Sequence, residues 1–168
     1  MWFLRGPLRL LLLPLLLIAA AASPAAGGEP RDAMCTFFDA VLKEAPTSFA
    51  ALRGKPMPGY TPMWEGKLKA PGATSCEASE TGYSCSLGAR PVVAKGKQEF
   101  QSLTRRIAAC YPGWKVTRNE RDTLSWNWNI RSGNNTISVE YVDITALGDE
   151  EEGSSGPELM VGVWAMKE

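Results

Sequence analysis

Apolar residues recur with a helical period in two parts of the chain. The first part follows Asp32. Its apolar face consists of Met34, Phe38, Val41 and Ala45. Asp32 can cap this helix because its carboxylate can accept the free amide protons of the first turn. Pro46 is expected to end the helix, since proline does not fit a helix interior.

The second helical pattern covers residues 95–109. Its apolar face consists of Phe100, Leu103, Ile107 and Cys110. Charged side chains lie off this face, and the Tyr-Pro-Gly sequence at residues 111–113 ends the pattern. Both helices are therefore expected to bury one side against another layer of the protein.

The remaining apolar segments have the period of β-strands. A hairpin is predicted over residues 71–88, with its tip at residues 79–82. Further strands are predicted over residues 63–68, 114–118, 123–130, 136–144 and 159–166. The last of them is apolar on both faces, which is typical of an interior strand. Residues 55–62 are rich in proline and predict a connector.

The sequence TLSWNWNI at residues 123–130 allows two interpretations. Its apolar residues, Leu124, Trp126, Trp128 and Ile130, fall on one side of the strand. The strand that follows offers a matching apolar side through Ile137, Val139 and Tyr141. We expect this face to be the core that the helices cover. The alternative is an open aromatic surface, formed by Trp126, Trp128 and Trp64, on which a sugar or peptide stacks.

These elements predict an α+β fold. The strands occur in runs joined by short turns, so they should pair antiparallel. We expect a sheet of about five to six strands, with the two main helices packed on one face and disulfides bracing the structure. One domain over residues 32–168 accounts for all of these elements, and residues 26–31 form a flexible tail before it.

Residues 1–25 have the pattern of a secretory signal peptide. Arg5 and Arg9 precede an uncharged apolar run over residues 10–22, and small residues follow. The run is shorter than the roughly 20 residues that a membrane span needs. Cleavage between about residues 22 and 26 would give a secreted or periplasmic product that no longer contacts the membrane.

The charge balance of the remaining chain argues against a polyanionic partner. Removing the leader takes away two of the 18 basic residues and none of the 18 acidic ones, so the product carries a charge of about −2. Nucleic acid and anionic membranes both require concentrated positive charge. We therefore expect a monomer that binds another protein.

The four cysteines predict two disulfides. Cys35, Cys76, Cys85 and Cys110 make an even number in an exported chain. If the hairpin has a four-residue tip, Cys76 lies opposite Cys85 and the two can pair. A helix that returns toward the base of the hairpin would instead join Cys76 to Cys110 and leave Cys35 for Cys85. We slightly favour this second pairing.

Catalytic and metal chemistry find little support in the sequence. The chain contains no histidine, so the commonest general base and the usual nucleophilic triads are missing. No zinc-type cysteine spacing occurs, and we expect neither a metal nor a cofactor. The acids that could serve a hydrolase are scattered in the sequence; they are Glu65, Glu77, Glu80, Asp122, Glu140 and Asp143.

Binding is therefore the expected activity. The acidic segment over residues 148–157 is the predicted contact, and its carboxylates belong to Asp149, Glu150, Glu151 and Glu152. We expect a non-catalytic accessory protein that binds another protein, with an inhibitor or immunity protein as the specific form. The alternatives are a carbohydrate- or peptidoglycan-binding module that uses exposed tryptophans and a carboxylate-dependent hydrolase.

Overall fold

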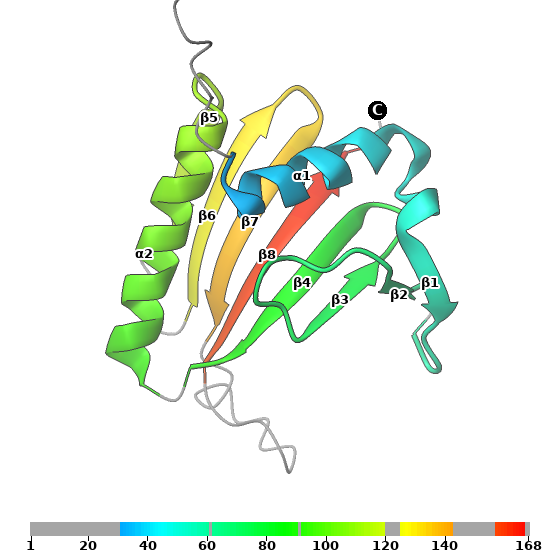
Figure 1. Cartoon of the computed structure of the whole chain (residues 1–168), viewed down its shortest axis with the longest axis horizontal. Coiled ribbons are helices and arrows are strands. Elements are labelled where there is room, and N and C mark those ends of the chain that lie inside the picture. The colour runs from blue at the N-terminus through cyan, green and yellow to red at the C-terminus, as the bar shows by residue number, and fades with distance from the viewer. Residues whose placement is uncertain (1–30, 61, 91, 120–124, 143–156, 167–168) are drawn as a thin grey trace, which may run out of the picture.

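The computed structural model describes residues 31–60, 62–90, 92–119, 125–142 and 157–166. The predicted leader, most of the N-terminal tail and the acidic segment lie outside these residues. Within them, two α-helices lie on the same face of one antiparallel sheet (Figure 1). This arrangement confirms the α+β class. No helix in the described ranges is long and apolar enough to cross a membrane.

Helix α1 spans Ala33–Glu44 and begins and ends where the sequence predicts. The Asp32 carboxylate accepts a hydrogen bond from the backbone N–H of Met34 at 2.8 Å, so Asp32 is the N-cap. The helix ends before Pro46, which belongs to the short 3-10 turn η1 (Ala45–Thr47). A second 3-10 turn, η2 (Ala50–Leu52), leads into the sheet.

Helix α2 spans Val93–Cys110 and buries the predicted face through Phe100, Leu103 and Ile107. A glycine lets this helix approach the sheet closely. A β-carbon added to Gly96 would lie 2.5 Å from the Cε2 atom of Tyr141. The glycine thus removes the side chain that would otherwise hold α2 away from the core.

In the described residues the sheet has eight strands, not the five to six expected. Their bounds are Arg53–Pro56 (β1), Trp64–Gly66 (β2), Ser75–Ala78 (β3), Gly82–Ala89 (β4), Lys115–Asn119 (β5), Ser125–Ser132 (β6), Asn135–Val142 (β7) and Glu158–Ala165 (β8). The prediction of a connector over residues 55–62 was wrong at its start, where β1 includes Pro56. An edge strand tolerates proline because one side of its backbone needs no partner.

The strands follow the order β1-β2-β3-β4-β8-β7-β6-β5 (Figure 1). Strand β8 thus lies between β4 and β7, and it joins the strands that precede α2 to those that follow it. This position confirms the prediction of an interior strand. Its apolar residues Leu159, Val161 and Val163 face the core, whereas Trp164 lies exposed on the opposite face.

The core lies between the helices and one face of the sheet. Trp128, Tyr83, Tyr141, Phe38 and Phe49 are its largest fully buried side chains. The cross-strand pairs follow the predicted register, since Trp128 lies opposite Val139 and Ile130 lies opposite Ile137. The pattern of TLSWNWNI therefore reports the inner face of the sheet.

The two disulfides join Cys35 to Cys110 and Cys76 to Cys85. The favoured alternative, Cys76 to Cys110 with Cys35 to Cys85, was wrong. Cys76 and Cys85 are directly opposite in the β3–β4 hairpin, with Cα atoms 4.0 Å apart. Helix α2 ends beside the first turn of α1 and not at the base of the hairpin, so Cys110 meets Cys35.

Candidate functional site

The three tryptophans predicted as a possible stacking surface do not form one. Trp128 is 1% exposed and belongs to the core. Trp126 packs edge-on against Phe100 at 5.7 Å between ring centroids, and the ammonium of Lys97 lies 4.4 Å from its centroid.

Trp64 lies on a different part of the inner face. The guanidinium carbon of Arg53 lies 4.0 Å from the centroid of its ring. One side of this indole is therefore already occupied by a cation. Trp64 and Trp126 are half-buried, and Trp64 lies on β2, away from the other two tryptophans on β6.

The opposite face of the sheet, which we call the outer face, points away from both helices. One row of residues crosses it from strand to strand. The residues of this row are Glu77, Ser84, Gly162, Ser138, Asn129 and Thr117. Its members on the three central strands are small, and this row forms a low strip on the surface.

Gly162 and Ser138 explain why this strip stays low. A β-carbon added to Gly162 would lie 3.2 Å from the carbonyl oxygen of Tyr83 and 3.4 Å from Ser138 Oγ. Ser138 itself is 3% exposed. Gly162 is buried as well, so the centre of this row is closely packed and has no projecting side chain.

Trp164 is the largest side chain beside this strip, and sequence analysis did not single it out. Its cross-strand neighbour on β4 is Gly82, and the indole lies over the place that a Gly82 side chain would fill. The indole Nε1–H donates a hydrogen bond to Ser138 Oγ at 2.9 Å. The residue is nevertheless 40% exposed. Trp164 is therefore an aromatic side chain held in a fixed position on an open face.

The apolar character of both faces of β8 hid this residue. The segment at residues 159–166 gives no alternation from which to choose the side that Trp164 occupies. The available signal was a glycine at position 82, at the start of the strand that becomes its neighbour. Large aromatic residues often cover a glycine on the adjacent strand.

Two carboxylates face each other at one end of the row. Glu65 on β2 is the direct cross-strand partner of Glu77 on β3. Like charges in this position destabilise a sheet. A pocket of about 370 Å³ is lined by both side chains and by Lys69. The Lys69 ammonium donates to the Thr74 carbonyl oxygen at 3.3 Å.

A second depression, of about 230 Å³, continues from this pair toward the centre of the sheet. Glu77, Ser84, Glu158 and Met160 are among its lining residues. The Ser84 hydroxyl donates to Glu77 Oε1 at 3.2 Å, and the Ser86 hydroxyl donates to Glu158. Glu65, Glu77 and Glu158 thus make this side of the outer face acidic.

The other predicted acids are not gathered at this end. Glu140 lies on the outer face opposite Met160, and Glu80 lies in the turn before β4. Asp122 and Asp143, like the acidic segment with Asp149 to Glu152, lie outside the described residues. Among the residues the structure describes, no group of three or more potential ligands could hold a metal ion.

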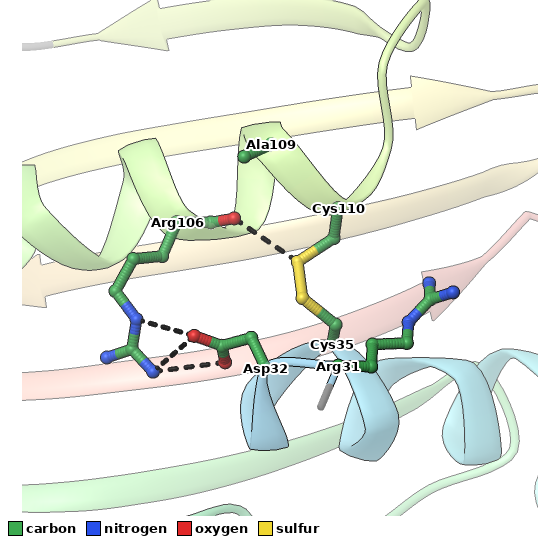
Figure 2. Close-up of a pocket in the computed structure, with 6 residues that line it drawn as sticks. All are labelled: Arg31, Asp32, Cys35, Arg106, Ala109 and Cys110. Carbon is green, nitrogen blue, oxygen red and sulfur yellow. Dashed lines mark hydrogen bonds and ion pairs between the residues drawn. A yellow bond between two sulfur atoms is a disulfide. The ribbon is translucent and has the colours of Figure 1, made fainter. Parts of the chain in front are cut away.

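A separate pocket of about 400 Å³ lies between the two helices. It is lined by Arg31, Asp32, Cys35, Arg106, Ala109 and Cys110. Figure 2 shows the disulfide between the two arginines, with Arg106 turned toward Asp32. Arg106 Nε and Nη2 donate to the two oxygens of the Asp32 carboxylate at 2.9 and 3.0 Å. Hydrogen bonds from Arg106 hold the pKa of Asp32 below its usual value, although burial opposes this.

A tyrosine closes one end of the contact between the helices. The Tyr111 hydroxyl donates to the Asp39 carboxylate at 2.9 Å and lies 3.3 Å from the Cys35 carbonyl oxygen. Burial, together with the charge of Asp39, raises the pKa of Tyr111 well above its usual range. Tyr111 therefore stays neutral and acts as a hydrogen-bond donor that ties α2 to α1.

No protein-family model, curated protein or solved structure matches this chain. The side-chain geometry of the outer face and of the pocket between the helices is therefore the basis for a functional assignment.

Proposed function

We propose that this protein is an exported, non-catalytic accessory protein that binds another protein through its outer face. The observation that carries this proposal is Trp164. Its indole is exposed, yet Gly82 and Ser138 fix its position. Tryptophan is enriched among the few residues that supply most of the energy of protein interfaces. An indole already held in place loses little conformational entropy on binding.

The acidic side of the outer face supports a partner with basic side chains. Glu65 and Glu77 lie directly opposite each other on neighbouring strands. A lysine or arginine from a partner would reduce the repulsion between them and would gain charge-assisted hydrogen bonds. Electrostatic complementarity of this kind contributes to specificity and to the rate of association.

The low strip beside Trp164 supports a flat contact. Ser84, Gly162 and Ser138 carry no long side chain, and Gly162 and Ser138 are buried, so none of the three projects from the sheet. A partner would meet Trp164 as the exposed side chain beside this row. We infer binding and not turnover because the chain contains no histidine, the commonest general base, and Glu65 is solvent-exposed.

The two disulfides are compatible with an oxidising extracellular environment. Together with the leader pattern over residues 1–25, they support export to the periplasm or the medium. We retain the prediction that the acidic segment with Asp149 to Glu152 adds a contact to the same partner. An inhibitor or immunity protein that acts as a monomer would fit this description.

Capture experiments with variants of the exported chain test the proposal. A photo-crosslinking amino acid at Met160 should attach the partner to the outer face. The Trp164→Ala variant should lose most of this crosslinking, and Glu77→Gln should weaken it more at low salt than at high salt. Tyr60→Ala is the matched control, since Tyr60 is exposed on a loop before β2. Equal capture by Trp164→Ala and the native chain would rule out the outer face as the binding surface.

A carbohydrate ligand is the second candidate, and Trp164 also favours it. One face of an indole can stack on a sugar ring, and the half-buried Asn129 lies in the same row of the outer face. Titration with peptidoglycan fragments should then quench tryptophan fluorescence in the native chain and not in Trp164→Ala. Saturable quenching without a crosslinked protein would favour this candidate over a protein partner.

A further inference from the structure

We propose that the Cys35–Cys110 disulfide is a thiol–disulfide exchange site, at which a small thiolate attacks Cys110 and Cys35 departs. This inference concerns the pocket between the helices and does not depend on the outer face. Thiol–disulfide exchange requires access to a sulfur atom and a leaving thiolate that the protein stabilises. The pocket provides both.

Solvent exposure distinguishes this disulfide from the other one, although Cys76 and Cys85 also line depressions on the sheet. Cys35, Cys76 and Cys85 are all buried, with exposed fractions of 4%, 9% and 1%. Cys110 is half-buried and borders the pocket, and its neighbour in the lining is the small side chain of Ala109. Figure 2 shows that the sulfur–sulfur bond crosses the pocket between the helices. A thiolate can therefore reach Cys110 without unfolding the protein.

The helix ends determine which sulfur leaves. Cys35 is the third residue of α1, so its sulfur lies at the positive end of the helix dipole. Cys110 is the last residue of α2, at the negative end. A negative charge is therefore more stable on Cys35 than on Cys110.

The charged groups around the pocket are paired with each other. Arg106 is paired with Asp32 and Arg31 with Asp39, so these side chains add little net charge beside the sulfurs. The preference for Cys35 as the leaving thiolate therefore depends on the helix ends. The Cys110 sulfur lies 3.2 Å from the carbonyl oxygen of Arg106, which disfavours an anion there.

The step is balanced without an external oxidant. The attacking thiolate forms a new sulfur–sulfur bond with Cys110 Sγ, and the bond between Cys110 and Cys35 breaks. The electron pair of that bond remains on Cys35, which leaves as a thiolate. The product is a mixed disulfide at Cys110 and one free thiol at Cys35.

The fold should survive this exchange. The Asp32–Arg106 ion pair and the hydrogen bonds of Tyr111 still join the two helices. The buried residues of α1, Phe37, Phe38 and Val41 among them, still hold it against the core. The exchange therefore modifies one surface of a folded domain.

The test uses the native oxidised chain and reduced glutathione as the probe. After timed incubation, acid stops the reaction, an alkylating reagent labels free thiols, and mass spectrometry of peptides locates both products. We expect glutathione on Cys110 and the label on Cys35, while Cys76 and Cys85 remain joined. The exchange should be at least about tenfold faster at the helix pocket than at the hairpin. Far-ultraviolet circular dichroism should not change.

Ala109→Leu supplies the matched variant. A leucine at this exposed helical position should cover Cys110 and slow the exchange there, without altering the rate at Cys76–Cys85. Simultaneous opening of both disulfides would mean that exchange requires global unfolding, and the proposal would be wrong. Glutathione attached to Cys35 instead of Cys110 would overturn the assigned direction of attack.

Discussion

Removing each disulfide in turn should reveal how differently the two constrain the chain. The Cys35–Cys110 disulfide joins residues 75 positions apart, and the Cys76–Cys85 disulfide joins residues 9 positions apart. The first connects the start of α1 to the end of α2. The second connects two strands that the hairpin turn already brings together. Two double variants, each with both cysteines of one pair changed to alanine, separate these effects.

The expected costs follow from loop closure in the unfolded chain. For a separation of 75 residues the chain-entropy relation gives about 4.5 kcal/mol at 25 °C. For a separation of 9 residues it gives about 2.6 kcal/mol. Lost packing opposes the difference, because Cys85 is more deeply buried than Cys110. We therefore expect the Cys35–Cys110 variant to be the less stable of the two by about 1 kcal/mol.

Urea unfolding, followed by far-ultraviolet circular dichroism, measures both free energies of unfolding. The slopes of the two transitions need separate fitting, since a longer loop released in the unfolded state exposes more surface. A cost of several kcal/mol would be a large part of the typical stability of a domain. If the hairpin variant proved the less stable one, loop entropy would not be the main contribution of these disulfides.

Three further predictions concern other contacts. Arg106→Gln should destabilise the protein at about pH 6, and the difference in unfolding free energy should shrink as the pH falls below 3.8. The reason is that Arg106 lowers the pKa of Asp32 in the folded state. The stability that this ion pair contributes is therefore fully present above the ordinary pKa of 3.8, and it is lost as the pH falls through the lowered pKa. Gly82→Ala should displace the indole of Trp164 and lower the free energy of unfolding, but it should do so much less in a Trp164→Ala background. Urea unfolding of this double-mutant cycle should give a coupling energy of about 0.5–3 kcal/mol. Additive costs of the two substitutions would contradict the contact. Trp128→Ala should cost about 3–5 kcal/mol in urea unfolding, whereas Trp128→Phe should cost far less, because it keeps an aromatic ring and removes a buried N–H that has no hydrogen-bond partner in the described structure.

Local signals in the sequence were sufficient for the helices and for the core. Asp32 and Pro46 mark the two ends of α1, because capping and the effects of proline act over a few residues. The alternation around Trp128 identified the inner face because side chains of a strand point to alternate sides. Each of these features depends only on residues that are close in the chain.

The pairing of the cysteines required long-range information. The sequence predicts a helix that ends near Cys110, but it does not say what that end meets. The slight preference for Cys76 assumed a return to the hairpin. In the fold, α2 instead packs beside α1 over β7 and β8, and this brings Cys110 to Cys35.

The candidate site was missed for a related reason. Trp164 acquires its fixed, exposed position from Gly82 and Ser138, which belong to two different strands. Neither neighbour is close to Trp164 in the chain. Trp126 and Trp128 alternate with polar residues in the sequence because both side chains point to the inner face of the sheet. An aromatic side chain that serves binding need not belong to such a pattern.

The central place of β8 has a consequence for how the molecule assembles. Until this strand is available, β4 and β7 each have an unpaired edge, and the strands on either side form two separate half-sheets. Synthesis delivers β8 after the other seven strands of the described sheet, so β4 and β7 lack this pairing until Glu158–Ala165 has been made. A chain in that condition can still be extended, and the insertion of β8 between β4 and β7 is the step that joins the two half-sheets into one domain.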